Sequence, residues 1–309
     1  MGVGKTGGAR MGDGVTRGLD MGPRPPQIGS WRALLVLGRV SNLPTVWSDC
    51  LAAWLIGGGG AQGRLGALYA GATLLYTGGM FLNDAFDAAF DRQYRPERPI
   101  PSGQISVRAV WIWAMVTLGL GWMTFLALGR AAGVWGGGLF VAIVVYDAVH
   151  KRTMWAPLLM SLCRFLLYLA AAGAAKGGLS AAVAWRALAL AVYVAGLSCL
   201  ARGESRIVAF RRWNLMLLLA PIALVPFTGA ADPVWAWGAA GVFAVWILWC
   251  LRHGFLGRKD GFVRAVAGLL AGIALVDWLA ASTAGQGGSP AFIGLFFLAL
   301  VLQRVAPAT

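Results

Sequence analysis

Three aspartates stand at a spacing that suits the binding of a metal ion. Asp84, Asp87 and Asp91 step by three and then four residues, directly after Asn83. On a helix this spacing stacks the three carboxylates on one face, about one turn apart. Neighbouring carboxylates repel each other, and Mg²⁺ relieves that repulsion because it takes carboxylate oxygens and usually keeps phosphate oxygens among its ligands. The pattern therefore favours a magnesium–phosphate site.

Arginines follow these acids in the stretch NDAFDAAFDRQYRPERPIPSG, which runs from Asn83 to Gly103. The guanidinium groups of Arg92, Arg95 and Arg98 match the geometry of phosphate. Acids for a metal followed by arginines for an anion predict a diphosphate site. The alternative is that these charges merely cap a helix at the water interface, but such a cap does not require acids on one face.

The composition is that of a membrane protein. Of the 309 residues, 59% are hydrophobic and only 12% are charged, and the mean hydropathy is +0.70, whereas charged residues make up about 25% of soluble domains. A net charge of +14 would suggest nucleic acid in a soluble protein, but here the loops of a membrane protein account for it, and no nucleic-acid partner is expected. The four cysteines lie in apolar runs and form no CxxC pair, so they are expected to be small buried side chains.

Apolar runs near the ~20 residues that a membrane helix needs recur along the chain from Trp31. Residues 1–30 are rich in Gly, Pro and basic residues, which predicts a disordered cytoplasmic tail before a transmembrane domain at 31–305. The expected spans are 31–56, 66–90, 107–128, 131–149, 156–175, 185–203, 213–229, 234–252 and 262–283, with 290–304 as a candidate tenth. The predicted fold is an all-α polytopic bundle of about nine helices.

The distribution of basic residues predicts the orientation of the bundle. Lys and Arg gather in the loops after the second, fourth, sixth and eighth expected spans, and few lie in the intervening loops. Because cytoplasmic loops carry the excess of Lys and Arg, the N-terminus and the acidic motif are expected on the cytoplasmic side.

Several polar residues lie within the expected spans. Arg39 and Asn42 belong to the run LGRVSNLPTVWSD, and Arg164 to LCRFLLY. An arginine inside a membrane span needs a partner or an anionic ligand. The alternatives are that Arg39 extends to the lipid headgroups and that Arg164 makes a structural hydrogen bond between helices. Asp277 stands alone in the last long span, and the sequence assigns it no role.

Two further polar groups follow the fourth and sixth expected spans. The first, YDAVHKRT, places Tyr146 and His150 one turn apart, with Lys151 beside them. These side chains would face the same cavity as the acids, with the lysine screening diphosphate charge, although an isolated histidine is often an ordinary interface residue. The second, ARGESRIVAFRRW, contains Arg202 and Glu204 and is equally compatible with a plain cytoplasmic loop.

Taken together, these motifs resemble those of the UbiA family of intramembrane prenyltransferases. NDAFDAAFDRQYRPERPIPSG resembles the first aspartate-rich motif of that family, and RVSNLPTVWSD its opening segment. YDAVHKRT is similar to the tyrosine–lysine segment, with the lysine five rather than four residues after the tyrosine. The similarity covers about residues 30–285.

The resemblance implies a bundle of about nine helices around a central cavity open to the lipid. It implies an enzyme that binds a prenyl diphosphate through Mg²⁺ and passes the prenyl group to an acceptor, often an aromatic ring. The implied ligands of metal and diphosphate are Asn83, Asp84, Asp87 and Asp91. The residues expected to neutralise the leaving group are Arg39, Arg95, Arg98 and Lys151. Those expected to contact the substrates are Asn42, Tyr146, His150, Arg164 and Arg202.

One departure from the family pattern concerns its second aspartate-rich motif. This motif should follow the sixth span, where Glu204 is the one acid in ARGESRIVAF. A second metal ion would therefore use Glu204 or be missing. Two other functions stay open: a non-catalytic binding or assembly protein that kept the fold, and a transporter whose charges line a path. Transporters usually show two related halves, and none is found in this sequence.

Overall fold

The structure is a computed structural model of the 309-residue chain, and it describes residues 1–2, 37–203, 213–255 and 261–305. Within those residues every regular element is a helix. The first part of the chain forms η1 (Val40–Asn42), α2 (Leu43–Ile56), α3 (Gln62–Tyr94), α4 (Val107–Leu128), α5 (Arg130–Val149) and α6 (Ala156–Ala174). The second part forms α7 (Ala181–Gly203), α8 (Trp213–Leu218), α9 (Ala220–Ala223), η2 (Val225–Phe227), α10 (Pro233–Phe255), α11 (Gly261–Ala271), α12 (Ile273–Thr283) and α13 (Ala291–Val305).

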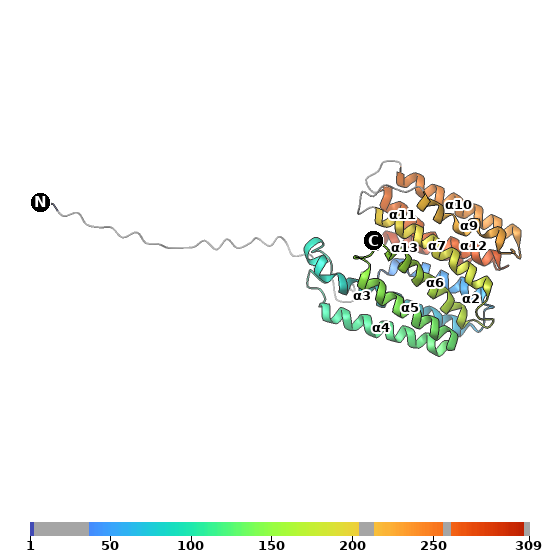
Figure 1. Cartoon of the computed structure of the whole chain (residues 1–309), viewed down its shortest axis with the longest axis horizontal. Helices are drawn as coiled ribbons and strands as arrows, with labels where there is room; N and C mark the ends of the chain where they lie inside the picture. The colour runs from blue at the N-terminus through green and yellow to red at the C-terminus, as the bar shows by residue number, and fades with distance from the viewer. Residues whose placement is uncertain (3–36, 204–212, 256–260, 306–309) are drawn as a thin grey trace.

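The long helices lie side by side in one bundle (Figure 1). Seven helices of the described chain are long and apolar enough to cross a membrane, counting α11 and α12 as one. They correspond to seven of the nine expected spans. The first expected span contains the 14-residue helix α2, and the candidate tenth span is the shorter apolar helix α13. The predicted tail at 1–30 lies almost entirely outside the described residues.

The expected span at 213–229 is not one continuous helix. It is broken into α8, α9 and η2, and prolines stand in the first turns of α9 and η2. Pro221 and Pro226 lack the backbone N–H of a helical residue, and their rings clash with the preceding turn. The prediction of a continuous helix here was wrong. An apolar composition indicates that a segment can lie in the bilayer, but it does not indicate that the segment forms one uninterrupted helix.

The connections between helices gather at two ends of the bundle. At one end, Gly177 N donates to Gly57 O at 2.8 Å, which joins the α6–α7 connection to the α2–α3 connection. Ala231, before α10, donates to the carbonyl of Thr283 at the end of α12. At the other end, the α5–α6 connection meets the last residues of α7, where Arg202 lies. Successive helices therefore alternate in direction, as the expected topology requires.

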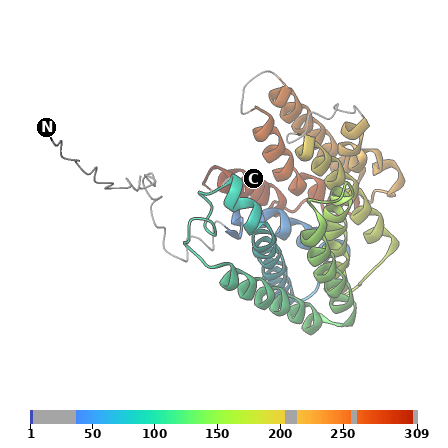
Figure 2. The same ribbon diagram turned by 60° about the vertical axis from the view of Figure 1, so that its left-hand side comes forward.

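Small residues allow the closest contacts between the helices. A Cβ atom added at Gly121 of α4 would lie 2.9 Å from Leu75 N and 3.0 Å from Gly71 O of α3. Close backbone approach of this kind is typical of membrane bundles. Helix α2 lies in the interior, in contact with α3, α6, α12 and α13 (Figure 2). These contacts, together with those of α5 with α3 and α6, fix the helices that carry the polar residues described next.

Candidate active site

The last turns of α3 carry three aspartates on a buried face. Asp84, Asp87 and Asp91 have exposed fractions of 4%, 9% and 2%. The helix continues to Tyr94, so all three side chains are fixed on one rigid element. Each carboxylate in such surroundings needs a positive partner or a metal ion.

Arg98 binds two of these carboxylates. Its Nη1 donates to Asp84 Oδ1 at 3.3 Å and to Asp91 Oδ2 at 2.9 Å. A turn after α3, in which Arg98 N donates to Arg95 O, folds this side chain back over the end of the helix. The sequence predicted that acids and arginines act on one ligand, and the structure shows that they also neutralise each other.

The middle carboxylate takes its partners from the α5–α6 connection. Lys151 Nζ lies 2.7 Å from Asp87 Oδ1, and His150 Nε2 lies 3.7 Å from the same oxygen. The ammonium also stands 3.9 Å from the ring centre of Phe90, which gives it a cation–π contact. The tyrosine–lysine segment and the aspartate motif are therefore in direct contact.

Arg39 reaches Asp84 from the residue before η1. Its Nη2 lies 3.7 Å from Asp84 Oδ1. The backbone of Arg39 has a φ of 42°, in the left-handed region, and such a conformation costs a residue other than glycine about 1–3 kcal/mol. The Tyr76 hydroxyl donates to the Arg39 carbonyl at 3.3 Å and supports this turn. The strained turn directs the guanidinium into the bundle, beside the acids.

Asn83 contacts an aspartate to which the sequence gave no role. Its Nδ2 donates to Asp147 Oδ1, on α5, at 3.0 Å. Asp147 is 3% exposed, and its second oxygen, Oδ2, is buried without a hydrogen-bond partner. The residue stands in the quoted run YDAVHKRT, and an acid within an apolar span was the signal that could have found it.

A pocket of about 1440 Å³ lies beside these residues. Its wall includes the predicted residues Arg39, Asn42, Tyr146, His150, Lys151, Arg164 and Arg202, together with Asp147. The three aspartates of α3 are not part of the wall, whereas two of their cationic partners, Arg39 and Lys151, are. An anion in the pocket would therefore meet basic groups first.

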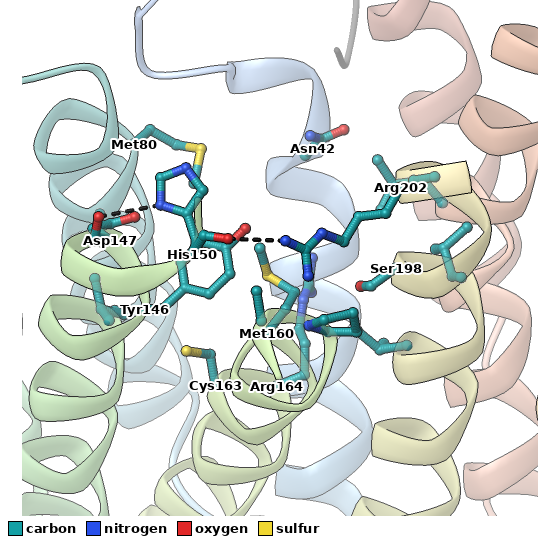
Figure 3. Close-up of a pocket in the computed structure, with 18 of the residues that line it drawn as sticks. Asn42, Met80, Tyr146, Asp147, His150, Met160, Cys163, Arg164, Ser198 and Arg202 are labelled. Atoms are coloured by element: carbon teal, nitrogen blue, oxygen red, sulfur yellow. Dashed lines mark hydrogen bonds between the residues drawn. The ribbon is translucent and has the colours of Figure 1, made fainter. Parts of the chain in front are cut away.

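The upper wall of the pocket is formed by the α5–α6 connection and α7 (Figure 3). The rings of Tyr146 and His150 stack with centroids 5.2 Å apart. Arg202 Nη2 donates to the carbonyls of His150 and Thr153, both at 3.0 Å. Arg202 thus holds the connection that carries Lys151 against the end of α7.

Arg164 lies lower in the same pocket and makes contacts between helices. Its Nη1 donates to Asp49 Oδ2, and its Nη2 donates to Thr45 Oγ1 at 2.9 Å. Asp49 is fully buried, and so is Asp277, which accepts from Ser48 Oγ at 2.6 Å. Of the two interpretations of Arg164, these contacts support the structural one, although its side chain also forms part of the pocket wall.

Two predicted residues lie away from this arrangement. Arg95 is exposed in the turn after α3 and is not part of the pocket wall. Glu204, the expected ligand of a second metal ion, lies outside the described residues.

The oxygen atoms of this site fit Mg²⁺ only as part of a larger ligand set. No three His, Cys, Asp or Glu side chains in the described chain are close enough to hold a metal ion among themselves. Mg²⁺, however, usually takes one or two carboxylates and completes its octahedron with water and phosphate oxygens. Asp91 Oδ1 is buried without a hydrogen-bond partner and is available as such a ligand. The residues therefore fit a magnesium ion that a phosphate ligand shares.

Comparison with protein families matches residues 41–261 to the UbiA prenyltransferase family. The chain is similar to two archaeal proteins named digeranylgeranylglyceryl phosphate synthase. The protein of Ignicoccus hospitalis is 33% identical over 126 residues, which are 40% of this chain and 41% of the relative. The protein of Methanothrix thermoacetophila is 40% identical over 84 residues, 26% of this chain and 32% of the relative. The chain thus matches less than half the length of these relatives.

Two solved structures share the fold. A structure of digeranylgeranylglyceryl phosphate synthase has a TM-score of 0.62 at 16% identity and covers 83% of this chain and 99% of its own. A UbiA homologue from Archaeoglobus fulgidus, bound to DMAPP and Mg²⁺, has a TM-score of 0.50 at 12% identity and covers 88% of this chain and 99% of its own. At these identities the likeness concerns the fold alone.

Proposed function

Because the chain belongs to the UbiA prenyltransferase family, we propose that it transfers a prenyl group from a prenyl diphosphate to a small acceptor within the membrane. The observation that carries this proposal is the layered charge at the pocket. Buried carboxylates of α3 stand behind Arg39 and Lys151, which face the pocket. Such a wall can bind a metal-chelated diphosphate, whereas an uncharged ligand would make no use of it.

The basic and the acidic residues of the site have different roles in the proposed transfer. Arg39 and Lys151 donate to oxygens of the diphosphate, and Arg98 is close enough to Asp84 and Asp91 to join them. Asp84, Asp87 and Asp91 would hold Mg²⁺. When bound, this ion stabilises the negative charge that develops on the leaving diphosphate. Fixed positive donors at those oxygens favour departure in the same way, because they need no reorganisation during the reaction.

The hydrocarbon part of the donor would occupy the apolar part of the pocket. Leu75, Leu139, Leu167, Val194 and Leu270 belong to this part of the wall. Relative to water, burial of each CH₂ group there contributes about 0.8 kcal/mol, most of which a chain in the bilayer has already gained. We further propose that the pocket is the central cavity expected from the family and that it opens to the lipid, so that the prenyl chain enters from the bilayer.

The acceptor belongs to one of two chemical classes. The names of the similar archaeal proteins refer to a glycerol phosphate lipid, which favours a hydroxyl-bearing acceptor. An aromatic ring is the other class, and the functional test includes both.

Heat stability of the purified protein tests the binding step. Geranylgeranyl diphosphate should raise the unfolding temperature in the presence of Mg²⁺ and have little effect when EDTA is added. Release of diphosphate with geranylgeranylglyceryl phosphate or 4-hydroxybenzoate then tests the transfer. Protection without transfer to any acceptor would identify a binding protein, and absence of protection would refute both functions.

A further inference from the structure

We propose that Asp147 is the binding group for a hydroxyl of the acceptor, so that the acceptor of this protein carries a hydrogen-bond donor at the reacting end. This inference rests on the proposed function and assigns the acceptor class. It comes from the one oxygen of Asp147 that the protein leaves unused.

Asp147 differs from the other acids around the pocket in its partners. Asp84, Asp87 and Asp91 each form an ion pair with Arg or Lys, and so does Asp49. Asp147 forms none within the described residues, and its one side-chain hydrogen bond comes from the neutral amide of Asn83. Oδ2 of Asp147 therefore keeps its full capacity to accept a hydrogen bond.

Asp147 Oδ2 is buried, and a buried oxygen without a hydrogen bond has a free-energy cost. Asp147 is 97% buried and part of the pocket wall, and Oδ2 has no partner. A buried polar atom left without a partner costs about 1–3 kcal/mol, more when it is charged. A ligand that brings an O–H or N–H group to this oxygen removes that cost, and a hydrocarbon ligand does not.

The surroundings favour a hydroxyl over a metal ion. A divalent cation is held by several oxygen ligands, whereas the side-chain hydrogen bond of Asp147 comes from a nitrogen donor, Asn83 Nδ2. Met80 lies one turn before Asn83 on α3 and in the same wall (Figure 3), and methionine chains adapt readily.

A second oxygen on the pocket wall repeats this pattern. Asn42 Oδ1, from η1, is buried and also has no hydrogen-bond partner. Two accepting oxygens on different elements of one pocket suit a ligand head with more than one hydroxyl.

The test compares ligands that differ only in the hydroxyl. Two pairs serve as probes: geranylgeranylglyceryl phosphate and 4-hydroxybenzoate, each with the methyl ether of its free hydroxyl. Binding is measured to the full-length protein with Mg²⁺ and a non-reactive thiolodiphosphate analogue of geranylgeranyl diphosphate. For at least one pair, the wild type should bind the hydroxyl form about 3- to 10-fold more tightly, the range expected for one hydrogen bond.

Asp147→Asn is the informative variant because it keeps the shape of the side chain and an oxygen for Asn83. Its new amide N–H donates to an ether oxygen as well as to a hydroxyl oxygen, so the preference should disappear. The Kd of the diphosphate analogue should stay within about 3-fold of the wild-type value, well below a tenfold change. The matched control is Asp232→Asn, at the start of α10, which should keep the wild-type preference.

Three results would overturn the inference. The first is a wild type that binds the diphosphate analogue but prefers no hydroxyl probe, which leaves the proposed diphosphate function intact. The second is an unchanged preference in Asp147→Asn. The third is loss of analogue binding in that variant, which would place Asp147 in the metal and diphosphate site. If the wild type does not bind the analogue at all, the proposed function fails as well.

Discussion

Oppositely charged side chains from different elements neutralise each other around the end of α3. Arg98 pairs with Asp84 and Asp91, and Lys151 pairs with Asp87. Burial of an isolated carboxylate in an apolar bundle has a high free-energy cost. These ion pairs lower that cost and so stabilise the buried acids when no ligand is bound. The same cations can turn to a diphosphate without leaving the site.

Asp87→Asn tests the assignment of the aspartates. The substitution keeps the shape but removes a negative charge that would hold Mg²⁺. We expect transfer, and Mg²⁺-dependent protection by the diphosphate, to fall at least about 100-fold, since even residues that only support metal ligands cost 10–100-fold when changed. Activity is measured as diphosphate release. The control is Glu97→Gln, an exposed acid ten residues further on. Wild-type turnover in Asp87→Asn would disprove the metal assignment.

Arg164→Met distinguishes a structural arginine from a ligand-binding one. Asp49 is fully buried, and Arg164 donates to it. Loss of the partner should destabilise the protein by about 3–5 kcal/mol, because it leaves a buried charge uncompensated. Denaturation in detergent measures this. Adding Asp49→Asn should recover part of the loss, whereas normal stability with weakened substrate binding would favour the ligand role.

Among the helices, the contact between α3 and α4 depends on residues without side chains. Gly121 of α4 lies against backbone atoms of α3, and a Cβ there would come within 2.9 Å of Leu75 N. Backbone atoms cannot move aside as flexible side chains can, so a methyl group must push the helices apart. Because α3 carries the aspartates, this contact also sets their position.

Gly121→Ala is therefore expected to destabilise the protein by about 1–3 kcal/mol, the usual cost of overpacking. Gly119 lies on the same helix with nothing within 4 Å of its added Cβ. Gly119→Ala should be neutral or stabilising by up to about 1 kcal/mol, because alanine favours helix. Unfolding of both variants in detergent provides the comparison. Equal effects of the two substitutions would show that the contact is not tight.

Local sequence signals predicted some helices well. The expected span 107–128 has the same bounds as α4. Ser106 Oγ accepts from Ala109 N at the start, and Gly129, with a φ of 135°, follows the end. The segment at 213–229 was predicted less well. Its bounds were drawn from its apolar composition, which takes no account of the two prolines that break the helix.

For the site as well, features that depend on a single helix could be predicted from the sequence, whereas contacts between helices could not. The helical spacing of Asp84, Asp87 and Asp91 could be derived from the sequence, because it depends on one helix. The contact between Asn83 and Asp147 joins residues 64 positions apart, and it depends on how α3 and α5 pack. No local pattern contains that information. Likewise, the pairing of Arg164 with Asp49 could be expected only in general terms, since buried charges in membranes need partners.

Taken as a whole, the molecule has one end that is much richer in positive charge. Beside the ends of α3, α5 and α7, the described residues include Arg92, Arg95, Arg98, Arg108, Lys151, Arg152 and Arg202. The opposite end has Arg64, Arg130, Lys176 and Arg186. Of these, Arg64 donates to carbonyls of Leu128 and Ala174, and Arg186 is buried with Thr283. The charge difference predicts that the end of the bundle that carries Lys151 faces the cytoplasm.

Cysteine labelling tests this orientation in a variant whose four native cysteines are replaced. Gln93→Cys places an exposed thiol at the basic end, and Ala61→Cys places one at the opposite end. A membrane-impermeant maleimide should label Ala61→Cys in intact spheroplasts and Gln93→Cys only in inverted vesicles, because the positively charged end stays on the cytoplasmic side during insertion. The reverse pattern would place the aspartates on the outer side. The diphosphate head would then have to be bound from the outer side of the membrane.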